Sequence, residues 1–107
     1  AASLAAAEEV IAVDGVDMVL IGTNDLMADL GIPGQFDHPL VHDAYVRTLA
    51  VCKKHGKHVG VGGLSTRPDL VEKYVKMGAR YVSTGTDLAF LMAACTQRAE
   101  QVRGITL

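Results

Sequence analysis

Two polar residues, Asn24 and Asp25, follow a largely apolar run at positions 16–21 and a single glycine, Gly22. The run is typical of a buried strand, and the small-residue turn brings the carboxylate of Asp25 to the start of a helix. In parallel α/β proteins, the carboxyl ends of strands and the amino ends of helices meet at the edge where ligands bind. A carboxylate there can hold a divalent cation, and nearby backbone N–H groups attract an anion. The turn therefore predicts a corner that a metal ion and an anionic substrate share.

Asp25 also has a purely structural explanation. Aspartate and asparagine are common at the N-cap of a helix, where the side chain accepts a hydrogen bond from the first turn. The local pattern leaves the metal role and the capping role both open. Asp29, four residues further on, is expected to tie down the loop or to face solvent.

The ends of two later apolar segments supply further candidates. Gly62 follows the segment 58–61, and Thr84 ends the segment 80–84. Gly62 either leaves room for substrate or permits close packing of the backbone. Thr84 is expected to line the pocket, whereas Asp87 is expected to be the N-cap of the last helix.

Four histidines suggest metal binding only superficially. His38 and His42 have the spacing of a zinc pair, but the proline after His38 disfavours a helical conformation there, and no glutamate follows it. Both imidazoles are therefore expected to be exposed to solvent. His55 and His58 lie at the amino end of a strand and are expected to be structural.

Hydrophobic periodicity and glycines define the elements that must position these residues. The expected elements are a helix ending near Val13, a strand at 16–21, a helix from Pro39 to Gly56, a strand at 58–61, a helix at 67–77 with Thr66 as N-cap, a strand at 80–84 and a last helix after Asp87. The residues expected to face the core are Leu4, Ala7, Val10, Ile11, Val41, Ala44, Tyr45, Thr48, Leu49, Cys52, Leu70, Val71, Tyr74, Leu88, Leu91, Met92, Cys95, Ala99 and Val102.

This alternation predicts an α/β fold. Glycine at each helix-to-strand joint favours right-handed βαβ units and a parallel sheet. Three such strands alone would leave both edges of the sheet unpaired. A complete β/α barrel takes about 250 residues, more than twice the length of this chain. We interpret residues 1–107 as a single segment, the C-terminal portion of one (β/α)8 TIM barrel whose upstream strands are absent.

Composition excludes several classes of function. The 107 residues carry a formal net charge of -2 with scattered signs, so no basic patch predicts a nucleic-acid partner. No apolar run approaches the roughly 20 residues of a membrane span, and acidic Glu8 and Glu9 stand where a signal peptide would be basic. Cys52 and Cys95 both fall on apolar helical faces and are expected to be buried, reduced thiols of a cytoplasmic protein.

A longer motif carries a family resemblance. The run 13–26, which reads VDGVDMVLIGTNDL, resembles the signature of the metal-dependent, class II pyruvate aldolases of the 4-hydroxy-2-oxoheptanedioate aldolase (HpcH/HpaI) family. Support at matching spacings comes from Asp29-Leu30-Gly31, Gly34, His38-Pro39, Gly56-Lys57 and Gly78-Ala79.

This resemblance implies a TIM barrel of the phosphoenolpyruvate/pyruvate-binding type. Its reaction would be the reversible cleavage of 4-hydroxy-2-oxo acids to pyruvate and an aldehyde, through a pyruvate enolate held by Mg²⁺ or Mn²⁺, or by Co²⁺. Asp25 matches the aspartate ligand of the metal, and the backbone N–H groups of Asn24 and Asp25 match those that receive the pyruvate carboxylate. Gly62 falls where relatives often carry a bulky aliphatic residue, so a glycine would open the aldehyde side.

The remaining family residues are expected upstream. The glutamate ligand, the basic histidine and the substrate-holding arginine have no match here, so no catalytic residue is assigned within this segment and the chain is expected to be incomplete for catalysis. The turn also reads Gly-Thr-Asn-Asp where many relatives have Gly-Pro-Ala-Asp. A homo-oligomer is expected, because the final helix of related barrels packs against a neighbouring subunit.

Three alternatives remain at this stage. The first is a thioester lyase of the citryl or malyl type, which would need a coenzyme A site. The second is a non-catalytic binding module of flavodoxin-like shape, which normally has five strands. The third is a degenerate scaffold that keeps the fold without activity.

Overall fold

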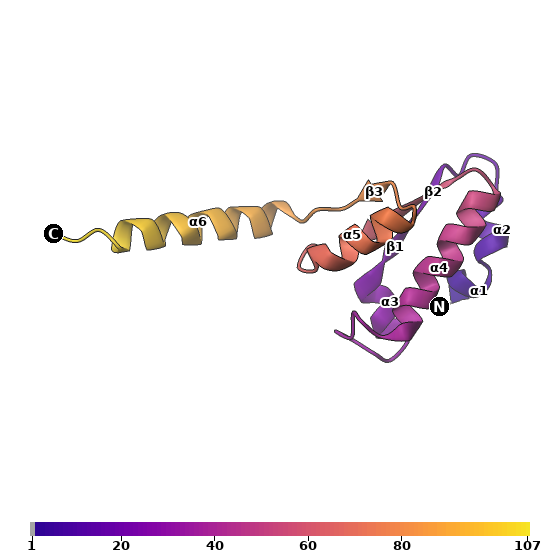
Figure 1. Cartoon of the computed structure of the whole chain (residues 1–107), viewed down its shortest axis with the longest axis horizontal. Coiled ribbons are helices and arrows are strands. Elements are labelled where there is room, and N and C mark those ends of the chain that lie inside the picture. The colour runs from indigo at the N-terminus through magenta and orange to yellow at the C-terminus, as the bar shows by residue number, and fades with distance from the viewer. Residues whose placement is uncertain (1) are drawn as a thin grey trace.

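A computed structural model describes residues 2–107 as an α/β arrangement with a short parallel sheet (Figure 1). Its elements are α1 (Ala2–Ala5), α2 (Ala7–Ile11), β1 (Met18–Gly22), α3 (Thr23–Asp29), α4 (Pro39–Lys54), β2 (His58–Gly62), α5 (Pro68–Met77), β3 (Tyr81–Val82) and α6 (Asp87–Arg103). None of these helices is long and apolar enough to cross a membrane.

The sheet is parallel with the strand order β1-β2-β3. The register pairs Met18 with His58 and continues to Gly22 opposite Gly62, so β1 and β2 end side by side. The third strand is shorter than the predicted segment 80–84. Backbone hydrogen bonds from Arg80 N to Val59 O (3.0 Å) and from Ser83 N to Val61 O (2.9 Å) nevertheless extend its pairing by one residue on each side.

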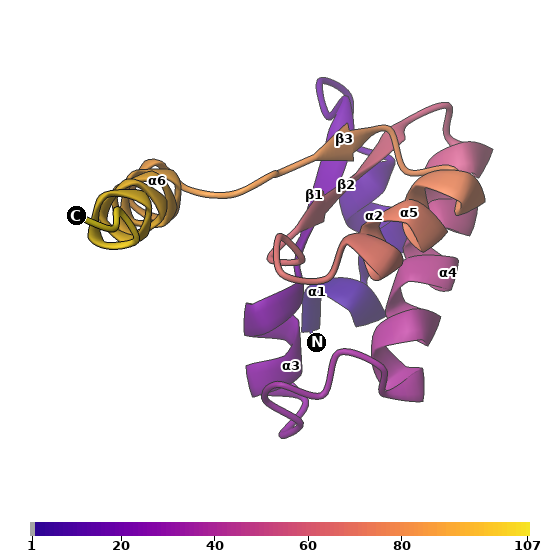
Figure 2. The same ribbon diagram turned by 60° about the vertical axis from the view of Figure 1, so that its left-hand side comes forward.

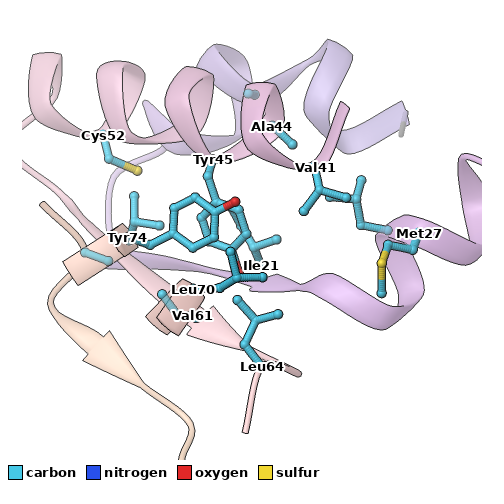
Figure 3. Close-up of a cluster of buried hydrophobic side chains, with 14 of the residues drawn as sticks. Ile21, Met27, Val41, Ala44, Tyr45, Cys52, Val61, Leu64, Leu70 and Tyr74 are labelled. Atoms are coloured by element: carbon cyan, nitrogen blue, oxygen red, sulfur yellow. The ribbon is translucent and has the colours of Figure 1, made fainter. Parts of the chain in front are cut away.

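One face of the sheet is covered by α4 and α5 (Figure 2). Their apolar residues meet Val59 and Val61 of β2 in the core, where the rings of Tyr45 and Tyr74 stack with centroids 3.8 Å apart (Figure 3). The predicted inward faces of both helices are confirmed. The fully buried members include Val41, Tyr45, Cys52 and Tyr74. The packing of α4 and α5 on this face holds β2 in position, and with it the strand end that borders the candidate site.

The opposite face of the sheet is bare within the described chain. Leu20 of β1 and Tyr81 of β3 are 49% and 47% exposed. Both side chains lean over Gly60 of β2, because an added Cβ there would lie 2.9 Å from Leu20 Cδ1 and 3.1 Å from Tyr81 Cδ1. Strands of parallel sheets are normally covered on both faces, so this face is one that a further layer would cover.

Helix α6 extends away from the rest of the molecule (Figure 1). None of its residues is buried, so the predicted core stripe is wrong for this chain. The residues concerned are Leu88, Leu91, Met92, Cys95, Ala99 and Val102. Cys95 is correspondingly exposed, in contrast to buried Cys52. The periodicity predicts the helix correctly, but the side that it marks as apolar has no partner in residues 2–107.

Helix ends also differ from the predictions. Thr86, rather than Asp87, is the N-cap of α6, and its Oγ1 accepts a hydrogen bond from Ala89 N at 3.3 Å. The N-cap position of α5 is Arg67 rather than Thr66, without a side-chain capping bond. At α6 both Thr86 and Asp87 suit the N-cap position chemically, and at both helices the backbone conformation shifts the start by one residue from the prediction.

His38 and His42 were predicted to be exposed to solvent, but both are partly buried. His38 is the N-cap, and its Nδ1 accepts a hydrogen bond from Leu40 N at 3.1 Å. His42 is partly buried beside Tyr74, with ring centroids 6.4 Å apart. His55 is structural as predicted, because its Nε2 lies 3.1 Å from Glu8 Oε1 and joins α2 to the end of α4.

The first predicted helix is interrupted. It forms two short helices, α1 and α2, with Ala6 between them. Ala7 and Ile11 are buried as predicted, whereas Val10 is 47% exposed.

Candidate metal and substrate site

The turn after β1 is the first turn of α3. Gly22 occupies the N-cap position with φ −79° and ψ 90°, and Thr23, Asn24 and Asp25 follow as helical residues. Asp25 is therefore not the N-cap, and no side chain caps this helix. The amide N–H groups in a first helical turn have no intrahelical acceptor, so they remain available to a ligand.

Thr23 fixes the turn to its surroundings. Its buried hydroxyl donates a hydrogen bond to Gly62 O at 2.6 Å and therefore accepts the proton of the Tyr45 hydroxyl, 2.7 Å away. Burial raises the pKa of Tyr45 to about 12, so the phenol stays protonated as a donor. Sequence reasoning did not single out Thr23. The available signal is a hydroxyl residue placed directly after a buried strand.

Asp25 lies on the unpaired side of β1. Its exposed side chain lines a cavity of about 400 Å³, together with Asp29, Leu20 and residues of α1 and α2. An added Cβ at Gly22 would lie 3.4 Å from Asp25 Oδ2, so the glycine gives the carboxylate room above the strand end. Because the sheet order places β2 on the other side of β1, this cavity borders the edge at which a preceding strand would pair.

Asn24 points to the other side of the turn. Its Nδ2 donates a long hydrogen bond of 3.4 Å to Gly63 O, and its side chain lines a second cavity of about 360 Å³. Neighbouring residues of one turn thus face two cavities on either side of β1.

Gly62 is buried and closely packed. An added Cβ would lie 3.0 Å from the carbonyl oxygen of Ile21 and 3.4 Å from Leu20 Cδ1. Of the two explanations for this glycine, the structure favours close backbone packing, and its carbonyl also receives the Thr23 hydroxyl. Thr84 is exposed in the connection from β3 to α6 and lines neither cavity, whereas its neighbour Ser83 lines the second.

An arginine fixes the long loop between α3 and α4. The Arg67 guanidinium donates to both oxygens of Asp37 at 2.9 and 2.8 Å and to both oxygens of Asp69 at 3.0 and 2.8 Å. These hydrogen bonds hold the pKa values of the two carboxyls below their usual range. The loop is thereby tied to the start of α5, near the second cavity.

The carboxylate of Asp25 suits a hard divalent cation but does not form a metal site alone. Mg²⁺ and Mn²⁺ prefer oxygen ligands and are often held by one or two carboxylates with water and substrate. Residues 2–107 contain no group of three or more His, Cys, Asp or Glu side chains that could hold a metal ion. A ligand set of three or more such side chains would need residues beyond 2–107, across the cavity at the open edge of β1.

Comparison with known proteins adds sequence evidence. Residues 1–94 match the family model described as "HpcH/HpaI aldolase/citrate lyase". The chain is 43% identical over 91 residues to a 4-hydroxy-2-oxovalerate aldolase of Rhodococcus jostii, covering 85% of this chain and 34% of that protein. It is 37% identical over 93 residues to a 5-keto-4-deoxy-D-glucarate aldolase of Klebsiella pneumoniae, covering 87% of this chain and 36% of that protein.

Solved structures of the same family share the fold of this chain. An HpcH/HpaI aldolase/citrate lyase family protein from Burkholderia cenocepacia superposes with a TM-score of 0.81 at 33% identity, over 94% of this chain and 38% of that one. A citrate synthase superposes with a TM-score of 0.78 at 23% identity, over 94% of this chain and 40% of that one, which shows a shared fold only. The chain spans about a third of the length of the curated relatives that it matches.

Proposed function

Because this chain belongs to the HpcH/HpaI aldolase/citrate lyase family, we propose that its protein catalyses the reversible cleavage of 4-hydroxy-2-oxo acids to pyruvate and an aldehyde. The observation that carries the proposal is the place of Asp25, an exposed carboxylate at the end of β1, beside a cavity on the unpaired side of that strand. Relatives named as aldolases support this reaction class.

Each residue of the turn has a part in this proposal. Asp25 holds the divalent metal, Mg²⁺ or Mn²⁺, together with ligands from elsewhere in the full protein. The bound metal would supply Lewis acidity toward the negative charge that develops on the 2-oxo oxygen during cleavage. The backbone N–H groups of Asn24 and Asp25 receive the carboxylate of the 2-oxo acid. Thr23 holds both in place through Tyr45 and Gly62.

The chain alone is expected to be inactive. Within residues 2–107, no histidine, arginine or glutamate lines the cavity beside Asp25, and Asp29 is the one other carboxylate in its lining. The apolar residues exposed along α6 suggest a homo-oligomer in which a second copy covers this helix. The partners proposed for the protein are therefore small 2-oxo acids, aldehydes and further copies of itself.

The test is deuterium exchange into the methyl group of pyruvate, followed by NMR, in the full natural protein with and without Mn²⁺. Proton removal from this methyl group is the half-reaction that aldol condensation with any aldehyde requires. We expect metal-dependent exchange in the wild type and at least about a hundredfold slower exchange in Asp25→Asn, since even outer-shell partners of metal ligands contribute 10- to 100-fold.

Asp29→Asn is the matched control, because Asp29 lines the same cavity one helical turn further along. It should retain most of the exchange. Equal loss in both variants would contradict a specific metal role for Asp25. No exchange in the folded, metal-loaded wild type would favour a thioester lyase of the same family or an inactive scaffold.

A further inference from the structure

The cavity beside Asn24 is formed by the connections that follow all three strands. Asn24 comes from the turn after β1, Ser65 and Thr66 follow β2, and Ser83 and Thr86 follow β3. Its volume is about 360 Å³, which is enough for a small organic molecule.

This cavity lies at the same end of the sheet as the proposed reaction site, because Asn24 and Asp25 are neighbours in the turn after β1 and each lines one of the two cavities. Side chains alternate along a strand, so Ser83 projects to the same face as Tyr81, the face that is not covered by α4 and α5. Ser83 also follows β3 at the level of Gly62, where β1 and β2 end. A 2-oxo acid whose carboxylate is held by the backbone N–H groups of Asn24 and Asp25 could therefore extend along the Asn24 side chain into this cavity.

The lining is rich in neutral hydroxyl groups. The side chains of Ser65, Thr66 and Ser83 have no hydrogen-bond partner within residues 2–107, and Thr86 Oγ1 accepts one bond from Ala89 N and keeps its proton to donate. Each hydroxyl can both donate and accept, which matches the hydroxyl groups of a ligand. None of the described residues that line the cavity is Lys, Arg, His, Asp or Glu, so this part of the lining carries no charge that would neutralise a carboxylate.

One wall of the cavity is held in place by an ion pair. Phe36 lines the cavity from the α3–α4 loop and packs against the hydrophobic core. The next residue, Asp37, is bound by Arg67 through two hydrogen bonds. Bidentate arginine–carboxylate pairs add geometric specificity, so the position of Phe36 is fixed before a ligand arrives.

From these features we infer that the cavity receives the aldehyde portion of the substrate and selects short, uncharged, hydroxylated aldehydes. This inference rests on the proposed aldolase function and names the substrate class of that site. In the condensation direction, the pyruvate methyl carbon loses a proton and bonds to the aldehyde carbon, and the aldehyde oxygen gains a proton. The hydroxyls of Ser65 and Ser83 bind the substituents of the aldehyde rather than the reacting carbon.

The test compares three aldehydes with pyruvate in the full natural protein loaded with Mn²⁺. Glyceraldehyde carries hydroxyls, propanal has the same carbon number without them, and succinic semialdehyde carries a carboxylate. We expect kcat/KM to be highest for glyceraldehyde. Ser83→Ala and Ser65→Ala should each lower it about three- to tenfold for glyceraldehyde, as loss of one hydrogen bond predicts, and less than about twofold for propanal.

Thr106→Ala, beyond α6 and outside this cavity, is the control and should leave both values unchanged. Pyruvate methyl exchange is measured in every variant. If exchange persists but propanal or succinic semialdehyde is preferred, or if Ser83→Ala affects glyceraldehyde and propanal equally, the substrate class is wrong and the aldolase proposal stands. If the wild type shows no exchange, the aldolase proposal fails and this inference fails with it.

Discussion

Helices α4 and α6 are alike in sequence pattern and opposite in environment. They have 16 and 17 residues, and both carry apolar side chains at helical spacing. Helix α4 buries Val41, Ala44, Tyr45, Thr48 and Cys52 against the sheet, whereas α6 buries none of its residues. An apolar stripe thus indicates that a helix needs a partner, and the partner itself has to be supplied by tertiary structure.

The largest expected effect is a difference in the free energy of unfolding between a substitution on α4 and one on α6. In the 107-residue chain, Tyr45→Ala should lower the free energy of unfolding by about 3 to 5 kcal/mol, because it removes a stacked, fully buried ring. Leu91→Ala on α6 should change it by less than about 0.5 kcal/mol, since Leu91 is 61% exposed. Urea denaturation followed by circular dichroism measures both.

A large loss for Leu91→Ala would break the comparison, because it would show that α6 is covered in solution. The same two variants should also be measured in the full natural protein. There, a substantial effect of Leu91→Ala would locate the surface that covers α6.

The second effect is a loss of stability at alkaline pH, and it arises from Tyr45 on α4. Burial raises the pKa of Tyr45 from its usual value near 10 to about 12, so the unfolded chain loses this proton first as the pH rises. The corresponding stability is complete below pH 10 and is lost between about pH 10 and 12, amounting to roughly 2 to 3 kcal/mol. Tyr45→Phe should remove this part of the pH dependence. An unchanged alkaline profile in Tyr45→Phe would contradict the assignment.

The smallest effect is a difference in thiol reactivity. Cys52 on α4 is buried, and burial raises the pKa of its thiol, whereas Cys95 on α6 is exposed. A disulfide reagent should therefore modify Cys95 rapidly in the native chain and Cys52 only as the chain unfolds. Mass spectrometry after timed quenching distinguishes the two. Protection of Cys95 in the full protein, relieved by dilution, would indicate a partner subunit on α6.

Local chemistry was enough to predict most of the fold. Glycines at 15, 56 and 78 adopt positive φ at the helix-to-strand joints, and the three strands are parallel as predicted. Helix ends were less predictable, as Thr86 and Asp87 show. Both side chains can cap a helix, and only the backbone conformation of the connection decides which residue is the first outside it.

The candidate site was predictable in part. Asn24 and Asp25 were identified from a strand, a turn and a helix start, and the structure places them on two sides of one strand end. Thr23 was missed because its role depends on Gly62 and Tyr45, which are 39 and 22 residues away. Substrate contacts by Asn24, Asp25, Gly62 and Thr84 stay predictions, and the structure suggests Ser83 as an additional candidate beside Thr84.

The sequence by itself determined which segments form helices and strands, which sides of them are apolar, and which turn carries a carboxylate to a strand end. These properties depend on spacing and turn chemistry within a few residues. Only the tertiary structure decided that Cys52 is buried and Cys95 exposed, that Ser83 rather than Thr84 lines a cavity, and that Gly62 packs against β1. The physical reason is that burial and cavities are formed by residues distant in sequence, so similar local patterns lead to different environments when the opposing surfaces differ.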